Sequence, residues 1–349
     1  GGSPQDYFNT VLYTGNGADN HAISGVGFQP DWVWMKSRNN ARSHALVDSV
    51  RGRGSILYSD LTNAQEAPAA SNNDLVSFDT DGFTVGTPER AGSTNTNNDT
   101  IVAWNWKAGT SFSNDASATG IGSIDSAGSV NTDVGFSIIN FTGTGSIQTV
   151  AHGLSKAPEI IFEKSREKAD SWIVYAEPLG NTKGLILNGT NAEIDSDTYW
   201  NDTSPTSTVW TMGDQNSVNV SGQQTIAYCF HSVDGYSKIG SYIGTGNNDG
   251  TFVYTGFRPA FTILKRTDAS GRSWIMQDSA RSPTNPVIIE VDADATATEY
   301  SSNASGGYNV DYVSNGFKIR TTNVNWNADG GKYIYIAFAE QSQKYSNAR

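Results

Sequence analysis

The apolar residues of this chain fall in short runs of roughly four to seven residues, and Gly, Asn, Asp and Pro separate the runs. Runs of this length predict β-strands, because a typical strand needs only about five or six residues. Gly and Asn adopt the positive φ values of tight turns at low cost, so the residues between the runs predict turns. No long segment repeats its apolar residues with a helical period, and the pattern therefore indicates an all-β chain.

The same order of turns and strands occurs three times along the sequence. Each copy has a glycine turn after an apolar stretch, then a proline that introduces an apolar strand ending in basic residues, and finally an apolar and aromatic strand. The glycines are Gly15, Gly143 and Gly244, the strands after the prolines are residues 32–38, 160–166 and 261–266, and the closing strands are residues 101–106, 225–230 and 333–338. The distance from glycine to closing strand is nearly constant, which predicts three diverged repeats.

These landmarks divide the chain into three β-sandwich repeats at residues 7–110, 134–233 and 234–341. Residues 111–133 are rich in Gly, Ser, Ala and Asn and are predicted to be a linker, and residues 342–349 a C-terminal tail. About seven or eight strands per repeat favour a jelly-roll or lectin-like sandwich, with a barrel as the alternative. Whether the repeats lie in a line or around a pseudo-threefold axis stays open.

Composition narrows the functional classes. The net charge of −12 argues against nucleic acid as a partner, because such binding needs clustered Lys and Arg. No run of 18 or more apolar residues occurs, which argues against membrane insertion. The single cysteine, Cys229, lies in an apolar run and is predicted to be a buried thiol. The start at Gly1 without an initiator Met suggests a processed or truncated product.

No catalytic, cofactor-binding or metal-binding residues are predicted. A glycosidase needs two carboxylates about 5 to 10 Å apart, and the sequence favours no such pair. The string 79–82, Asp-Thr-Asp-Gly, lacks the later ligands of a calcium loop and is better explained as a turn. The Asp pairs at 195/197 and 292/294 are interpreted as solvated loop residues, with Ca²⁺ retained as an alternative.

Aromatic residues among Asn, Ser and Thr are the candidates for surface binding. They are Tyr199, Trp200, Tyr300 and Tyr308. Aromatic side chains beside polar groups are typical of carbohydrate-binding and protein-binding loops. Trp210 lies in a similar context, and we expect it to be buried between adjacent copies instead.

Basic residues recur at the ends of equivalent strands, at Lys36/Arg38, Lys164/Arg166 and Lys265/Arg266. Their recurrence suggests a role in the framework, such as pairing with Asp48 or Asp278 of the same repeat. A sugar or polyanion site is the alternative.

Several strings together resemble a repeat family of uncharacterised function, the DUF7483-like domains of tailed-bacteriophage tail and structural proteins. These strings include residues 13–17, 48–52, 77–83, 103–109, 254–261 and 344–349, so the resemblance spans nearly the whole chain. In that family the repeats often stand on the C-terminal side of long virion proteins. The resemblance supplies no established catalytic residues.

The resemblance implies a non-enzymatic virion structural protein on the extracellular surface of a tailed bacteriophage. A tail fibre or related receptor-binding appendage is the first hypothesis, with other virion proteins and a host cell-surface glycan or protein as partners. The oligomeric state stays open, and a homotrimer is one alternative. A capsid decoration or head-fibre protein is the second hypothesis. An extracellular carbohydrate-binding adhesin or glycosidase is the third.

Overall fold

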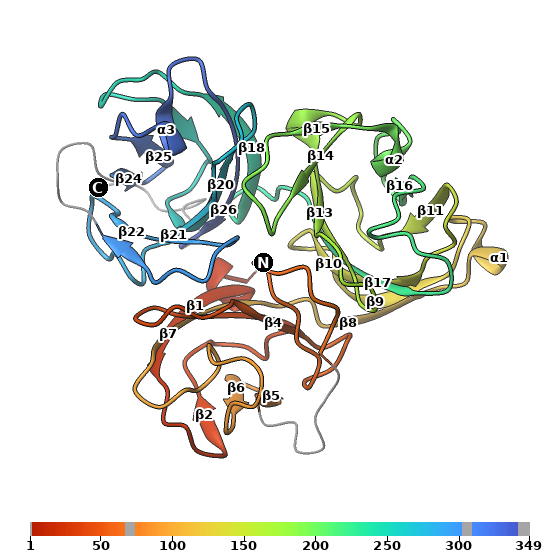
Figure 1. The fold of residues 1–349 in the computed structure, drawn as a ribbon, viewed down its shortest axis with the longest axis horizontal. Coiled ribbons are helices and arrows are strands. Elements are labelled where there is room, and N and C mark those ends of the chain that lie inside the picture. Colours follow the sequence, from red (N-terminus) through yellow and green to blue (C-terminus); the bar gives the residue numbers. More distant parts are fainter. Residues whose placement is uncertain (1, 67–73, 302–308, 341–349) are drawn as a thin grey trace.

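The computed structural model describes residues 2–66, 74–301 and 309–340. These residues form antiparallel sheets with very little helix. Figure 1 shows three lobes around one centre. We call the lobes unit 1 (β1 to β7), unit 2 (β8 to β17) and unit 3 (β18 to β26). The prediction of an all-β chain of sandwiches is confirmed, and the barrel alternative is wrong, because each unit packs two separate sheets against each other.

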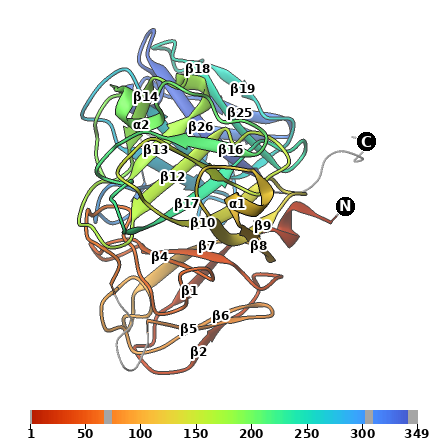
Figure 2. The ribbon, with the colours of Figure 1, turned by 90° about the vertical axis from the view of Figure 1, so that its right-hand side faces the viewer.

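Unit 1 has a larger sheet of order β1-β7-β3-β4 and a smaller sheet of order β2-β6-β5. Figure 2 shows these two sheets as layers, with β1 and β7 above β2, β5 and β6. The strands are β1 (Phe8–Thr14), β2 (His21–Ile23), β3 (Trp32–Ser37), β4 (Ala45–Asp48), β5 (Leu75–Asp79), β6 (Gly82–Val85) and β7 (Thr100–Trp106), and the turn η1 (Pro4–Asp6) precedes them.

Unit 2 has the largest sheet, of order β15-β14-β13-β12-β17-β10-β9-β8, and a smaller sheet of β11 and β16. Its strands are β8 (Thr110–Asn114), β9 (Ser126–Asn131), β10 (Phe136–Thr142), β11 (Gln148–Ala151), β12 (Ile160–Ser165), β13 (Ile173–Ala176), β14 (Lys183–Ile186), β15 (Ile194–Asp195), β16 (Val209–Met212) and β17 (Gln224–Phe230). Its helical turns are α1 (Ala116–Thr119), η2 (Glu177–Leu179) and α2 (Asp197–Trp200).

Unit 3 has a larger sheet of order β18-β26-β20-β21-β22-β23 and a smaller sheet of order β19-β25-β24. Its strands are β18 (Ser237–Ile243), β19 (Phe252–Tyr254), β20 (Pro259–Arg266), β21 (Trp274–Asp278), β22 (Ile289–Asp292), β23 (Tyr300–Ser301), β24 (Val310–Val313), β25 (Gly316–Ile319) and β26 (Lys332–Ala339), with the helical turn α3 (Val324–Asn327). No helix in the described part of the chain is long and apolar enough to cross a bilayer.

The larger sheets share one plan, which fixes residue equivalences between the units. In each, the strand after the proline lies between the closing strand and a shorter strand, as β3, β12 and β20 do. The pairings Trp34 with Trp104, Phe162 with Tyr228 and Ile263 with Ile336 occupy the same place in the three registers. The repeats detected in the sequence therefore correspond to equivalent strand positions in the three sheets.

The two faces of each larger sheet bury different sets of side chains. One face packs on the smaller sheet of the same unit and forms a separate core in each lobe. The other face points to the centre of the molecule, where side chains of all three units form one common core. Its aromatic members include Phe8, Trp32, Trp106, Phe136, Tyr228, Phe230, Phe261 and Phe338. Burial on both faces explains why β3, β12 and β17 are almost continuously apolar.

Stacked rings join the units at the centre. The ring of Trp32 in unit 1 lies 4.0 Å from the ring of Tyr228 in unit 2, at an interplanar angle of 7°. Phe8 of unit 1 stacks on Phe338 of unit 3 with centroids 5.0 Å apart. Aromatic pairs add about 0.5–1.5 kcal/mol beyond the area that they bury. The units are therefore packed around one axis and do not form a linear array.

Residues 111–133, expected to be a linker, contain the end of strand β8, the helical turn α1 and strand β9. β8 pairs with β9, and β9 pairs with β10, so this segment extends the larger sheet of unit 2. Gly128 of β9 is required there, since a Cβ atom at this position would lie 1.8 Å from the Ile138 carbonyl oxygen. The linker prediction was wrong because a hairpin of small and polar residues carries little apolar periodicity.

Candidate functional site: the contacts between units and the outer face of unit 3

Three ring side chains at equivalent positions join neighbouring units. Each precedes or begins the strand β4, β13 or β21, and each directs a ring nitrogen at a backbone carbonyl of the adjacent unit. The pairs are His44 Nε2 with Asp292 O at 2.8 Å, Trp172 Nε1 with Tyr58 O at 2.8 Å, and Trp274 Nε1 with Ile186 O at 2.9 Å. The acceptors also occupy equivalent positions, so the contacts run in one direction around the axis.

The hydrogen bonds of His44 determine its protonation. Trp34 Nε1, which can only donate, lies 2.9 Å from His44 Nδ1, so Nδ1 accepts and Nε2 carries the proton donated to Asp292 O. Burial, and after it the nearby Lys36 ammonium, lower the pKa of His44 to about 3. His44 is therefore neutral at physiological pH, and it makes the same contact as the two Trp rings.

A buried aspartate and arginine form a second repeated contact. Arg51 Nε lies 2.5 Å from Asp48 Oδ2, and the equivalent Arg281 Nε lies 2.6 Å from Asp278 Oδ2. All four side chains are 0% exposed. Each aspartate also accepts from the next unit, because the Tyr228 hydroxyl donates to Asp48 at 2.6 Å and Trp104 Nε1 donates to Asp278 at 3.2 Å. The Asp48–Arg51 pair therefore lies at the interface between units 1 and 2, and the Asp278–Arg281 pair lies at the interface between units 1 and 3.

The interface between units 2 and 3 has neither the Asp–Arg pair nor the donor from the adjacent unit. Ala176 of unit 2 stands where the other units have the aspartate, and Leu179 stands where they have the arginine. Ile336 of unit 3 occupies the position of the donors Tyr228 and Trp104. Ala176 and Ile336 are both buried in the central core. A donor without an acceptor would be costly there, so the joint replacement by apolar residues is physically consistent.

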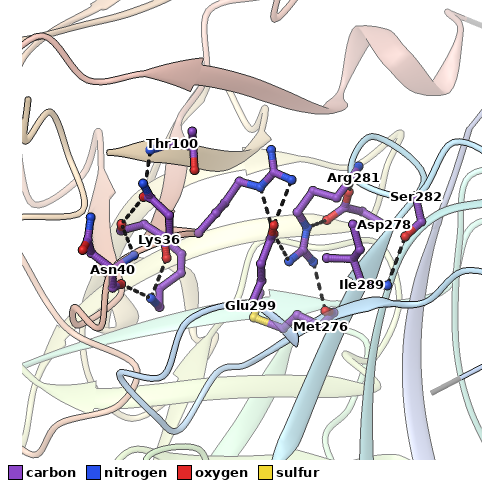
Figure 3. A network of polar contacts seen from close by, with 12 residues as sticks. Lys36, Asn40, Thr100, Met276, Asp278, Arg281, Ser282, Ile289 and Glu299 are labelled. Carbon is purple, nitrogen blue, oxygen red and sulfur yellow. Dashed lines mark hydrogen bonds and ion pairs between the residues drawn. The ribbon is translucent and has the colours of Figure 1, made fainter. Parts of the chain in front are cut away.

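Further polar contacts surround the pair at the 1–3 interface. Glu299 accepts from Arg38 Nε and Nη2 at 2.8 and 2.9 Å, and it lies 3.6 Å from Arg281 Nη1. Figure 3 shows Glu299 beside Arg281, which in turn contacts Asp278 and the Met276 carbonyl. This chain of charges connects Arg38, which follows β3 of unit 1, to Asp278 at the end of β21 of unit 3. Its desolvated members stabilise the interface only as a complete set.

The Lys side chains at the strand ends do not pair with Asp48 or Asp278, contrary to the expectation from sequence. Lys36 Nζ donates to the Ser37 and Asn40 carbonyls, Lys164 donates to Ser165 and Lys168 carbonyls, and Lys265 donates to the Arg272 carbonyl. All three are 0% exposed, so a polyanion cannot reach them. Burial lowers the pKa of each to about 8. Their role is to satisfy loop carbonyls within their own units.

Buried carboxyl groups occur in units 2 and 3. Burial raises the pKa of Glu163 to about 8, and Glu163 accepts from Trp210 Nε1 at 2.5 Å. Burial and the Asp292 carboxylate raise the pKa of Glu290 to about 9, and burial and Asp294 raise that of Asp292 to about 7. A catalytic acid requires such a shift, but it also requires access to a substrate. Glu163 is 0% exposed and Glu290 4%, which favours a structural role for both.

The aromatic residues predicted to bind at the surface have different fates. Tyr199 and Trp200 are 5% and 2% exposed, so the expectation that they are exposed is wrong. The short helix α2 turns both into the core of unit 2, where Trp200 Nε1 donates to the Lys183 carbonyl at 2.9 Å. Tyr300 is 40% exposed. Tyr308 lies outside the described residues.

Trp210 is buried, at 1% exposure, but it lies in the core of unit 2 and not between units. Its ring packs on Phe141 with centroids 5.7 Å apart.

The loop carboxylates considered for Ca²⁺ bind groups of the protein. Asp81 accepts the backbone N–H groups of Gly25 and Gly27 at 3.0 and 2.7 Å, and Asp79 accepts the hydroxyls of Ser77 and Thr84. Asp294 accepts the Trp274 N–H at 2.7 Å. Among the described residues, no group of three or more His, Cys, Asp or Glu side chains could hold a metal ion.

Unit 3 carries an exposed surface that the sequence patterns did not identify. Phe252 and Tyr254 of β19 are 44% and 66% exposed, while Val253 between them is buried in the core. An open polar groove of about 680 Å³ lies in the same unit and is lined by Asn247, Asn248, Asp249, Asn309, Asp311 and Arg320, among others. The signal in the sequence was the alternation of outward and inward positions along β19, which are exposed, buried and exposed in turn. A strand of only three residues is too short for this alternation to be recognised from the sequence.

This architecture defines a class: an antiparallel β protein of three sandwich units around a shared core. The chain belongs to the family described as a domain of unknown function, DUF7483, whose model matches residues 3–342. No curated protein and no solved structure matches the chain.

Proposed function

We propose that this chain is a non-enzymatic structural module of a tailed-bacteriophage virion, most consistent with a tail fibre or related appendage that contacts the host cell surface. The phage setting comes from the resemblance of the sequence strings to repeats of such virion proteins. The proposed partners are neighbouring virion proteins and a glycan or protein of the host surface. The proposed location is the outer surface of the virion.

The observation that carries this proposal is the common core of the three units. A protein outside the cell must resist unfolding and proteolysis without chaperones, and extensive burial is one route to this resistance. Here side chains of all three units share one apolar core, and equivalent ring contacts connect each unit to the next. Such a rigid body suits a mechanical support that holds outward loops in fixed positions.

The proposal is tested by incubating the purified chain with a panel of bacterial cells and with a glycan array, and by analysing the supernatants for released oligosaccharides. Binding without release is the expected result. Release of oligosaccharides would overturn the non-enzymatic assignment. Absence of binding to every cell type would overturn the role in host contact.

A second measurement tests the support role. Limited proteolysis of the native chain is expected to cut only exposed loops and to leave the three units associated. Rapid digestion of the strands in the common core would contradict the proposed rigidity. The matched control is the Asp48→Ala variant, in which the 1–2 interface carries an unpaired charge and digestion should be faster.

A further inference from the structure

The exposed aromatic pair of unit 3 is not required by the shared framework. Register places Phe252 and Tyr254 of β19 at the positions of Ala22 and Ser24 beside β2 in unit 1. In unit 2 the same positions are Thr149 and Ala151. The smaller sheets of units 1 and 2 thus form without aromatic residues at these positions. Two large exposed rings in unit 3 alone therefore point to a ligand.

The packing of the two rings leaves them accessible. β19 is the edge strand of the smaller sheet, and it lies beside β25 (Figure 2). Tyr254 is paired with Gly316, which has no side chain to cover a neighbouring ring. A Cβ atom at Gly316 would lie 3.1 Å from Phe252 Cζ and 2.0 Å from the Val253 carbonyl oxygen. The glycine is thus required where it stands.

The aromatic pair and the polar groove lie on one face. Phe252, Lys318 and Asp311 are cross-strand partners on β19, β25 and β24, so their side chains point to the same side of the sheet. Strands lie about 4.8 Å apart, which makes this row about 10 Å long. Asp311 lines the groove, so the row connects the exposed rings to it. A short oligosaccharide suits this length better than one sugar ring.

The charges of the groove and of Lys318, which pairs with a carboxylate of its lining, balance. Asp249 accepts from Lys318 at 2.8 Å, and Asp311 lies 3.4 Å from Arg320. Side-chain amides of Asn247, Asn248 and Asn309 add neutral donors and acceptors to the lining. An anionic ligand would meet the two carboxylates, and a cationic ligand would meet Lys318 and Arg320. The groove therefore suits a neutral ligand rich in hydroxyl groups.

We infer that the outer face of unit 3, formed by β19, β24, β25 and the groove beside them, binds a neutral saccharide. The apolar C–H face of a sugar ring packs on Phe252 and Tyr254, because aromatic faces carry negative charge density that attracts polarised C–H groups. The hydroxyls exchange hydrogen bonds with Asp311, Arg320 and the neighbouring amides. This inference rests on the proposed function, since it names the chemical class of the host ligand.

The test uses the full chain and an array of neutral hexose and N-acetylhexosamine oligosaccharides, with uronic-acid and sialylated glycans as charged counterparts. The affinity of the best neutral glycan is then measured by calorimetry for the wild type and the variants Phe252→Ala, Tyr254→Ala and Arg320→Gln. Tyr254→Ala is expected to weaken binding at least about tenfold, or about 1.4 kcal/mol. Tyr254→Phe keeps the ring and is expected to retain most of the affinity.

The matched control is Ile147→Ala, which removes an exposed apolar side chain of unit 2 that is 58% exposed. Its affinity should equal that of the wild type, and circular dichroism melting should show that every variant is folded. Neutral-glycan binding that survives both aromatic replacements would overturn the saccharide site. Exclusive binding of charged glycans, or binding to cells without binding to any glycan, would also overturn it while leaving the proposed host contact intact. No binding to cells or glycans would overturn both.

Discussion

Replacing Asp48 by Ala is expected to destabilise the chain more than any exposed charge removal. The change leaves the Arg51 guanidinium as an unneutralised charge between units 1 and 2, where the side chain is 0% exposed. It also removes the acceptor of the buried Tyr228 hydroxyl. Breaking a buried ion pair by removing one partner costs about 3–5 kcal/mol. We therefore expect the free energy of unfolding to fall by about that amount.

The chain itself supplies the compensating substitutions. Unit 2 has Ala176 and Leu179 at the positions of Asp48 and Arg51, so an apolar pair is already tolerated in this framework. The variant Asp48→Ala/Arg51→Leu/Tyr228→Phe removes the charge, its partner and the donor hydroxyl together. Replacing a buried ion pair by apolar residues of similar volume is often neutral or stabilising. The triple variant should therefore be within about 1.5 kcal/mol of the wild type, or above it.

Denaturant unfolding followed by tryptophan fluorescence measures these differences, since the chain has nine Trp residues. The control is Asp249→Ala, which removes a carboxylate that is 87% exposed and paired with Lys318. An exposed pair contributes about 0–1 kcal/mol. The reasoning is refuted if Asp48→Ala costs no more than Asp249→Ala. It is equally refuted if the triple variant is as unstable as the single one.

Three further predictions follow from buried polar groups. The pKa of His44 is lowered from 6.5 to about 3, so the folded chain loses stability as the pH falls below about 6.5. The variant Trp34→Phe/His44→Trp installs the residues that unit 2 has at these positions. Thermal melting from pH 7 to pH 4 should show a smaller loss of stability for this variant than for the wild type. The pKa of Glu163 is raised from 4.5 to about 8, so the free energy of unfolding falls as the pH rises from 4.5 to about 8. The slope of this fall is up to about 1.4 kcal/mol per pH unit, and Glu163→Gln should remove it. An unchanged slope for this variant in urea unfolding would contradict the burial argument. Trp172→Phe removes a hydrogen bond to the Tyr58 carbonyl across the 1–2 interface and should cost about 1–3 kcal/mol in denaturant unfolding.

The strands of the larger sheets could be predicted because they are buried on both faces. Such strands appear in the sequence as continuous apolar runs, and those at residues 32–38, 160–166 and 261–266 matched in type as well as order. The β8 and β9 hairpin escaped the same approach because its residues are small and polar, and Gly128 is needed there for close approach to β10.

The candidate site could be predicted only in part, because its partners come together through the tertiary fold. Asp48 and Arg51 are close in sequence, as Asp278 and Arg281 are, but the partner Tyr228 lies 180 positions further along the chain than Asp48. Tyr199 and Trp200 were misjudged since polar neighbours in sequence suggested exposure. The packing of Tyr199 on Gly184 could not be read from local pattern, because it depends on how α2 returns to β14.

The contrast between inward and outward faces explains where new function can arise in this fold. Inward positions must match a neighbour: Ala176 and Ile336 at the 2–3 interface are both apolar, whereas the equivalent positions at the other two interfaces hold an aspartate and its donor. Outward positions of the smaller sheets carry no such constraint. In unit 1 these positions hold the small residues Ala22 and Ser24. In unit 2 residues 123–126 pair with the edge of β11, through a bridge between Ile124 and Val150 and a hydrogen bond from the Ser126 hydroxyl to the Ala151 carbonyl. Only the equivalent strand of unit 3 among the described residues exposes two aromatic rings. Because the common core fixes the geometry of all three units, a change on one outward face can alter ligand recognition without altering the other two.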